Sequence, residues 1–283
     1  MENKFKICII GAGIVGLAIA ERLSRFYKNI LVVEKEDTFG QHVSSRNSEV
    51  IHSGFYYPKN SLKSNLCIDG NKMLYNFADM YHINYKKCGK LVVINDKNEE
   101  DELIKIMNHA IKCGLKNIKI LNKEESKIIE PIVNCYKSLF IPNAGIIDSH
   151  GVMAKLEYLS KKNDVNFLYQ SSITSISKEN NFYKISINDD ESLTSDIIIN
   201  AAGLWSDKIS NMIGLKKYKI EYYKGDYYKC TSLKNLNCLV YPTPGVASLG
   251  IHTVLGLDGG VSFGPNMYKV SRVDYSIDKK YHD

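Results

Sequence analysis

Three glycines near the start of the chain constrain its fold more than any other feature. The segment Gly11-Ala12-Gly13-Ile14-Val15-Gly16 follows a short, β-branched apolar run at residues 5–10 and opens a helical stretch over residues 14–26. A second apolar run, residues 30–34, ends on Glu34. Strand, tight turn, helix and strand within about 30 residues predict a βαβ crossover unit.

The glycine turn and Glu34 together match the fingerprint of a dinucleotide site. The first glycine permits a tight turn, the second lets the backbone approach a pyrophosphate, and the third lets the helix pack on the strand. The helix N-terminus offers N–H groups to the phosphates, and the acidic residue binds the adenosine ribose. NAD and FAD share this fingerprint, and a glycine turn of unrelated purpose remains the simpler alternative. The residues expected at the cofactor are Gly11, Gly13, Ile14, Val15, Gly16, Glu34 and Lys35.

Charge and composition argue against nucleic-acid binding. The 37 basic and 31 acidic side chains give a formal net charge of +6, but the lysines are scattered and form no basic block. The charge therefore indicates solubility and some attraction for anionic ligands or membranes.

Cysteine spacing and hydropathy indicate a reduced, cytoplasmic protein. The seven cysteines form no CxxC pair and have no histidine at metal-ligand spacing, so we expect free thiols and no metal site. The apolar run of residues 7–20 is shorter than the roughly 20 residues that a membrane span needs, and it lacks a cleavage-like site. We expect a protein without a signal peptide that has at most peripheral membrane contact.

Further elements follow the βαβ unit without an internal repeat. Residues 38–58 predict an ordered loop with a short helix, and residues 218–264 predict antiparallel strands. The turn Glu179-Asn180-Asn181 between two alternating runs predicts a hairpin. Helices are expected at 62–80, 98–113, 123–129 and 148–162, and strands at 90–94, 117–121, 171–177, 182–188 and 195–202.

Four polar or glycine-containing segments carry a family resemblance. They are Ser44-Ser45-Arg46-Asn47-Ser48-Glu49-Val50-Ile51-His52-Ser53-Gly54-Phe55-Tyr56-Tyr57, Asn200 to Asp207, Lys224 to Tyr228, and Gly250 to Asn266. In these segments the chain resembles the D-amino-acid-oxidase-like family of FAD-dependent oxidoreductases. Within that family it is most similar to the L-2-hydroxyglutarate dehydrogenases, over residues 5–266. The resemblance implies FAD as the cofactor.

The resemblance also gives two of these segments a place at the flavin. Small residues would let the first segment cross close over the isoalloxazine ring, and the Asn200 segment would end a strand at the cofactor edge of the sheet. A polar surface turn and a plain strand-to-helix corner remain the alternatives. The additional residues expected at FAD are Ser44, Ser45, Arg46, Asn47, Ser48, His52, Ala202, Gly203 and Trp205.

Two histidines and four other side chains are candidates for substrate chemistry. His252 is the first candidate for the base that removes the hydroxyl proton, and His52 is the second, because histidine titrates near neutrality. A histidine in a motif is often only a packing residue, and both assignments stay open. A carboxylate substrate needs cationic anchors, for which Arg46 is the first candidate unless it holds structure or flavin phosphate. The complete set of expected substrate-binding residues is Arg46, Tyr57, Lys224 and Tyr241.

The resulting prediction is an α/β protein, α+β overall, with two interleaved domains. A Rossmann-like FAD-binding domain would comprise residues 1–84 and 140–215, a mixed or antiparallel-sheet substrate domain 85–139 and 216–270, and a polar tail 271–283. The resemblance implies a further strand and glycine-led helix after the Gly-Pro-Asn turn, whereas this chain ends at Asp283.

The expected activity is oxidation of an L-2-hydroxy acid, with L-2-hydroxyglutarate as the implied substrate. Hydride would pass to flavin N5, and a quinone or another acceptor would reoxidise the flavin. The alternatives are a truncated, non-catalytic FAD-fold protein and an oxidase of an amino acid or another 2-hydroxy acid.

Overall fold

The chain forms two compact units in the computed structural model, which describes residues 4–188, 191–243 and 250–277. Unit 1 comprises Met1–Asn47, Ser149–Tyr222 and Val270–Asp274. Unit 2 comprises Ser48–Asp148, Tyr223–Lys269 and Tyr275–Asp283. Residues 244–249, within the region predicted as antiparallel strands, and residues 278–283 of the predicted tail lie outside the described residues.

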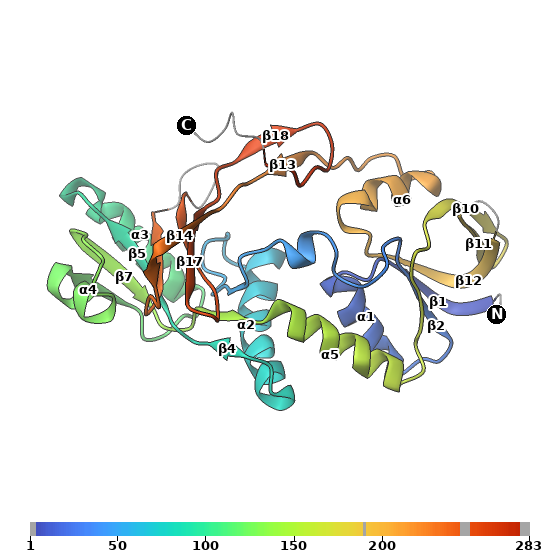
Figure 1. The fold of residues 1–283 in the computed structure, drawn as a ribbon, viewed down its shortest axis with the longest axis horizontal. Coiled ribbons are helices and arrows are strands. Elements are labelled where there is room, and N and C mark those ends of the chain that lie inside the picture. Colours follow the sequence, from blue (N-terminus) through green and yellow to red (C-terminus); the bar gives the residue numbers. More distant parts are fainter. Residues whose placement is uncertain (1–3, 189–190, 244–249, 278–283) are drawn as a thin grey trace. The chain divides into compact units, whose positions relative to one another are not determined.

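A six-stranded sheet organises unit 1, in the order β10-β11-β12-β1-β2-β9 (Figure 1). The neighbours from β12 to β9 pair in parallel, and β10, β11 and β12 pair antiparallel. This confirms the Rossmann-like class and the hairpin predicted after Glu179. The strands are β1 (Lys4–Ile10), β2 (Ile30–Val33), β9 (Asn166–Leu168), β10 (Ile173–Glu179), β11 (Phe182–Ile187) and β12 (Glu191–Asn200).

The helices of unit 1 pack on this sheet. α1 (Ile14–Ser24) lies against β1, β2 and α5 (Ser149–Lys162). α6 (Ser206–Met212) follows the 3-10 turn η3 (Gly203–Trp205) and packs against β10 and β12. The apolar side chains of β1 and β2 form the core, since nearly every residue of both strands is buried.

A four-stranded sheet in the order β15-β5-β7-β6 is central to unit 2. α3 (Glu100–Lys112) packs on this sheet, and its Leu103 and Ile106 join Val92 and Leu139 in a buried cluster. The strands are β5 (Lys90–Ile94), β6 (Lys119–Asn122), β7 (Lys137–Ile141) and β15 (Leu239–Pro242).

Shorter sheets and helices complete the described chain. Three strands pair as β14-β17-β16, three as β3-β8-β4, and two as β13-β18. Their bounds are β3 (Val50–Ile51), β4 (Tyr85–Lys86), β8 (Gly145–Ile147), β13 (Tyr222–Lys224), β14 (Tyr228–Lys234), β16 (His252–Leu255), β17 (Gly260–Gly264) and β18 (Tyr268–Val270). The other helical elements are η1 (Val43–Ser45), α2 (Leu62–Tyr81), η2 (Lys97–Glu99) and α4 (Lys123–Ile129).

The predicted antiparallel character of residues 218–264 is correct for β14, β16 and β17 but wrong for β15. β15 pairs in parallel with β5, with Leu239 opposite Lys90. Six strands, β3, β4, β7, β8, β9 and β18, were not predicted. Short strands give little periodicity, and the partner of β15 is remote in the sequence, so local patterns carry no signal for either.

The compact units divide the chain differently from the predicted functional domains. Residues 48–84 and 140–148 belong to unit 2, where the Asn71 side chain donates to the carbonyl groups of His52 and Asn143. The predicted domains are defined by ligand binding rather than packing, and they stay a prediction.

The described part of the chain contains no helix that is long and apolar enough to cross a membrane. Within the same residues, no group of three or more His, Cys, Asp or Glu side chains is arranged to hold a metal ion.

Candidate functional site

The glycine turn of unit 1 has a geometry that only glycine fits. Gly11 has a φ of 105°, and a Cβ there would lie 2.5 Å from the Ala201 carbonyl oxygen. A Cβ on Gly16 would lie 1.9 Å from the Gly11 carbonyl oxygen. The turn therefore brings the start of α1 directly against the ends of β1 and β12.

Ser44 lies beside the N-terminus of α1. Its Oγ accepts a hydrogen bond from the Ile14 N–H at 3.0 Å, and a Cβ on Gly13 would come within 3.0 Å of the same Oγ. The next N–H groups, of Val15 and Gly16, have no partner within the helix because of their position in its first turn. Val15 is 61% exposed, so this helix end is accessible to an anion.

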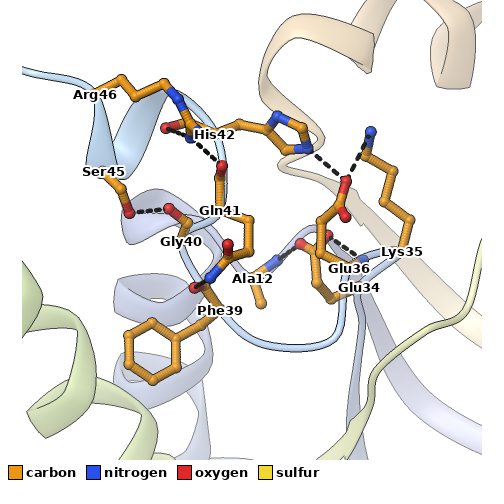
Figure 2. Close-up of polar contacts among 10 residues, drawn as sticks. All are labelled: Ala12, Glu34, Lys35, Glu36, Phe39, Gly40, Gln41, His42, Ser45 and Arg46. Carbon is orange, nitrogen blue, oxygen red and sulfur yellow. Dashed lines mark hydrogen bonds and ion pairs between the residues drawn. The ribbon is translucent and has the colours of Figure 1, made fainter. Parts of the chain in front are cut away.

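Glu34 is fixed beside the turn at the end of β2. Its Oε2 accepts from the Ala12 N–H at 2.7 Å, and its Oε1 accepts from the Glu36 N–H at 3.0 Å (Figure 2). Each carboxylate oxygen keeps a second lone pair, which can accept a hydroxyl of a ribose. The cradle and this carboxylate fit the pyrophosphate and ribose of a dinucleotide.

The Glu36 carboxylate, just after β2, contacts the side chains of Lys35 and His42. Its Oε1 lies 2.7 Å from His42 Nε2 and 3.2 Å from Lys35 Nζ (Figure 2). The hydrogen bond from His42 is the largest of the effects that lower the pKa of Glu36. Lys35 Nζ also lies 3.3 Å from the centroid of the Trp205 ring, which contacts the His42 ring at 4.5 Å. These contacts join the loop after β2 to η3.

The Arg46 guanidinium binds its own loop. Nη1 donates to the carbonyl oxygens of Gln41 and His42, and the side chain is exposed (Figure 2). Ser45 Oγ donates to the Gly40 carbonyl, and Asn47 Nδ2 donates to the Ser44 carbonyl at 2.8 Å. These side chains hold the predicted flavin loop in shape.

The predicted strand end on the cofactor side is shaped by Asn200. Its Nδ2 donates to the Ser206 carbonyl at 2.8 Å, and its Oδ1 accepts from the Ala202 N–H at 3.2 Å. Gly203 has a φ of 52°, so the chain turns sharply into η3. Ala202 and Gly203 thus follow β12 beside the glycine turn.

Unit 2 gathers five ionisable side chains that we call the Lys90 cluster. Its members are Lys90, Tyr56, Tyr241, His52 and His252. Lys90 Nζ lies 3.8 Å from the centroid of the Tyr241 ring and 5.3 Å from that of the Tyr56 ring. The Tyr241 ring stacks on the His252 ring, with centroids 3.9 Å apart and planes 20° apart. His52 interacts electrostatically with both Lys90 and His252.

The parallel pairing of β5 and β15 positions this cluster. Lys90 is opposite Leu239, so Lys90 and Tyr241 project from the same face of the sheet. Lys90 is 1% exposed, and no carboxylate of the described residues forms an ion pair with it. Burial is the main cause that lowers the pKa of Lys90 to about 7. The two tyrosine ring faces replace part of the lost hydration.

His252 has a defined tautomer. Its Nδ1 lies 2.8 Å from the Gly250 carbonyl oxygen, which can only accept, so Nδ1 carries the proton of the neutral ring. Burial and the charge of Lys90 lower the pKa of His252, although the bond to Gly250 opposes them. Nε2 is therefore left as a proton acceptor at neutral pH.

His52 is a neutral ring under the same influences. Burial, and after it the charge of Lys90, lowers the pKa of His52 to about 3. Asn71 Nδ2, on α2, donates to the His52 carbonyl at 3.0 Å and fixes its backbone. Both candidate bases are thus unprotonated at neutral pH.

The hydroxyl groups of Tyr56 and Tyr241 are buried, and no group of the described residues forms a hydrogen bond with either of them. Burial is the largest cause that raises the pKa of both, so each keeps its proton. A buried polar group without a partner is costly, and it indicates a position that a ligand can satisfy.

The structure brings together three of the predicted residues, His52, His252 and Tyr241. Two others, Tyr57 and Lys224, make different contacts within unit 2. Lys63 Nζ lies over the Tyr57 ring at 4.3 Å, and Lys224 Nζ donates to the Ser276 carbonyl. Arg46 belongs to unit 1, and Ser48 and His52, both expected at FAD, belong to unit 2.

Sequence reasoning missed Lys90 and Tyr56. The sequence signal that indicates burial of Lys90 is its place directly before the wholly apolar run Leu91-Val92-Val93-Ile94. A solvent-exposed edge strand would not contain such a run. Tyr56 stood inside the quoted motif but was not singled out.

The turn, the parallel sheet and Glu34 define a dinucleotide-binding protein. The sequence profile of the family described as DAO, FAD dependent oxidoreductase, matches residues 6–283. This chain belongs to that family of FAD-dependent oxidoreductases. The predictions of FAD as the cofactor, of the family and of an oxidoreductase class are confirmed by this match.

Relatives of similar sequence carry one functional name. The chain is 31% identical to the mitochondrial L-2-hydroxyglutarate dehydrogenase of Arabidopsis thaliana, an alignment that covers 96% of this chain and 64% of that protein. It is 31% identical to the L-2-hydroxyglutarate dehydrogenase of Indibacter alkaliphilus, over 96% of this chain and 72% of that protein. The chain therefore spans less than two thirds of the length of the first of these relatives.

A solved structure of similar fold contains FAD. The L-alpha-glycerophosphate oxidase of Mycoplasma pneumoniae, with FAD bound, superposes with a TM-score of 0.87 at 26% identity, over 99% of this chain and 74% of that chain.

Proposed function

We propose that this chain is an FAD-dependent dehydrogenase of an L-2-hydroxy acid, and that its substrate is L-2-hydroxyglutarate. The names of the relatives at about 30% identity support the substrate. The observation that carries the proposal is the Lys90 cluster, in which a buried cation without a carboxylate partner among the described residues lies near two neutral imidazoles. An anionic substrate that loses a hydroxyl proton needs a cation that binds its negative charge and a neutral base that accepts the proton.

The residues of unit 1 would hold the cofactor. Gly11, Gly13 and Gly16 would admit the pyrophosphate against the start of α1, and Glu34 would accept hydrogen bonds from the ribose. The Ser44–Asn47 loop and Ala202–Gly203 would contact the flavin part, as predicted from the sequence. The chemistry that FAD supplies when bound is acceptance of a hydride at flavin N5.

The residues of unit 2 would handle the substrate proton. His252 Nε2 accepts the hydroxyl proton while the carbon–hydrogen bond breaks, and the Gly250 carbonyl keeps the ring in the required tautomer. His52 is the alternative base. The uncharged state of both rings at neutral pH is what a base requires.

The experiment that tests the proposal is anaerobic mixing of purified, FAD-loaded protein with substrate. Loss of the visible flavin absorbance with L-2-hydroxyglutarate, but not with the D isomer, is the expected result. Protein that takes up no FAD, or flavin that stays oxidised, would support the non-catalytic alternative. Bleaching only by an amino acid or by another 2-hydroxy acid would support the oxidase alternative.

A second candidate substrate follows from the solved structure of similar fold. The M. pneumoniae protein is named for glycerophosphate, which is also an anionic alcohol. Bleaching by glycerol 3-phosphate and not by L-2-hydroxyglutarate would favour this candidate. A quinone, reached through a peripheral membrane contact, or another acceptor such as oxygen would reoxidise the flavin.

A further inference from the structure

We propose that Lys90 is the substrate-positioning cation of this protein and that it binds the carboxylate adjacent to the carbon that is oxidised. This inference rests on the proposed function, because it assumes that the ligand is a 2-hydroxy acid. It goes beyond that proposal by naming a residue, and the carboxylate group that the residue recognises.

The buried position of Lys90 carries a cost in folding free energy. An ammonium group that is removed from water and has no carboxylate partner destabilises the fold unless other interactions compensate. Lys90 heads a strand in which the next four residues are apolar, and Leu239 opposite is fully buried. Packing would be served as well by methionine or leucine, so the charge itself points to a ligand.

Two further hydrogen-bond donors belong to the rings that contact the Lys90 ammonium. The two rings that it contacts, Tyr241 and Tyr56, carry the two buried hydroxyls without partners. Lys90 and the two phenols are thus three donors in one cluster, and no acceptor among the described residues satisfies the two hydroxyls. A carboxylate offers about four acceptor positions on two oxygens, which complements such a set.

The positions of Lys90 and His252 favour the near carboxylate of a hydroxydicarboxylate over the distal one. The Tyr241 ring contacts Lys90 on the one hand and the His252 ring on the other. The cation and the base are therefore separated by a single aromatic ring. In a 2-hydroxy acid the near carboxylate is bonded to the carbon that carries the hydroxyl, so one molecule can reach both groups. The distal carboxylate lies several bonds farther away.

The groups facing Lys90 come from several elements. The thiols of Cys67 on α2 and Cys88 before β5 raise the pKa of Lys90, against the lowering by burial. His52 and His252 face it as neutral rings, and the Tyr56 and Tyr241 phenols keep their protons. Only Lys90 in this cluster changes its charge near neutrality.

The test measures binding of 2-oxoglutarate, the product of the proposed reaction, by calorimetry, with the FAD-loaded protein and no turnover. We expect Lys90→Met to raise the Kd by about 10-fold to 100-fold, as for loss of a charged hydrogen bond. Lys90→Arg, which keeps the charge, should bind within about tenfold of the wild type. Lys119→Met, which removes an exposed lysine from the same sheet, should leave the Kd unchanged.

Two further arms keep the test decisive. The Kd of the wild type should rise between about pH 6 and pH 9, whereas that of Lys90→Arg should stay level because arginine remains charged. This comparison still decides if Lys90→Met fails to fold. The loss caused by Lys90→Met should be equal for 2-oxoglutarate and for 2-oxopentanoate, which lacks the distal carboxylate.

The proposal is overturned if Lys90→Met binds like the wild type, or if the wild-type Kd does not change with pH. A loss confined to 2-oxoglutarate would assign Lys90 to the distal carboxylate and would also contradict it. Binding of glycerol 3-phosphate alone would make phosphate the anion. If binding depends on Lys90 but the flavin is never reduced, the proposed function fails while this inference stands.

Discussion

The His252 ring stacks on Tyr241 and donates its Nδ1 proton to the Gly250 carbonyl, which leaves Nε2 as the acceptor. Replacement by glutamine should slow flavin reduction by about 100-fold to 10,000-fold, the usual contribution of a general base. Stopped-flow absorbance under anaerobic conditions measures this rate. His150→Gln, which changes an exposed histidine of unit 1, is the matched control. If His52→Gln abolishes the rate and His252→Gln does not, His52 is the base.

The pH dependence of kcat/KM should reflect Lys90 rather than a histidine. Both histidines have pKa values lowered below 6.5, so they remain unprotonated across the neutral range. Lys90 must be protonated to bind an anion, and its pKa in the free protein is about 7. We expect kcat/KM to fall as pH rises through about 7. A profile that instead rises through neutrality would show that a base with an ordinary histidine pKa limits the reaction.

The same residue links stability to pH. Because the pKa of Lys90 falls from 10.5 in the unfolded chain to about 7 in the fold, the folded state binds fewer protons between these values. The free energy of unfolding should therefore rise with pH across this window. Lys90→Met should be more stable than the wild type near pH 6, by on the order of a few kcal/mol, since each pKa unit corresponds to about 1.4 kcal/mol. Urea unfolding at both ends of the window measures the difference. Equal stability of the two proteins near pH 6 would contradict the burial of a charged lysine.

At the scale of elements, the β1–turn–α1 unit makes the sharpest prediction. Gly16→Ala should abolish FAD retention and destabilise unit 1, because the new Cβ would meet the Gly11 carbonyl oxygen at 1.9 Å. Gly70→Ala is the matched control, since a Cβ at that position in α2 meets nothing within 4 Å. It should stabilise the protein by about 0.5–1 kcal/mol, as expected for alanine in a helix. FAD content after gel filtration and urea unfolding test both variants. FAD retention by Gly16→Ala would contradict the close packing.

Elements fixed by local chemistry were predictable from the sequence. The helix at 62–80 agrees with α2, which Ser61 caps by accepting from the Ser64 N–H. The helix predicted at 123–129 begins at Lys123 in the structure, as expected. Asn122 and Glu125 form a capping box at this helix start. These signals lie within a few residues of each other, so one stretch of chain contains all the information.

Elements fixed by remote partners were not predictable in the same way. β15 runs parallel to β5 because of pairing between segments far apart in the sequence, and this pairing buries Lys90. The motif histidines were recognised through resemblance to a family. Lys90 belongs to no motif, so its role could be inferred only from the register between β5 and β15.

At the scale of the whole molecule, cofactor binding should appear as stabilisation. A ligand that binds only the folded state stabilises by about 2.7 kcal/mol at 100 times its Kd. Added FAD should therefore raise the Tm of FAD-free protein in a concentration-dependent way, and NAD at equal concentration should not. A Tm that responds to NAD alone would contradict the assignment of the glycine turn to FAD.

The proposed function requires that the chain bind FAD and oxidise an L-2-hydroxy acid. The most direct measurement is the anaerobic visible spectrum of the FAD-loaded protein before and after addition of each isomer of 2-hydroxyglutarate. We predict full loss of the oxidised flavin absorbance with the L isomer and an unchanged spectrum with the D isomer. A spectrum that stays that of oxidised flavin with the L isomer would contradict the claim.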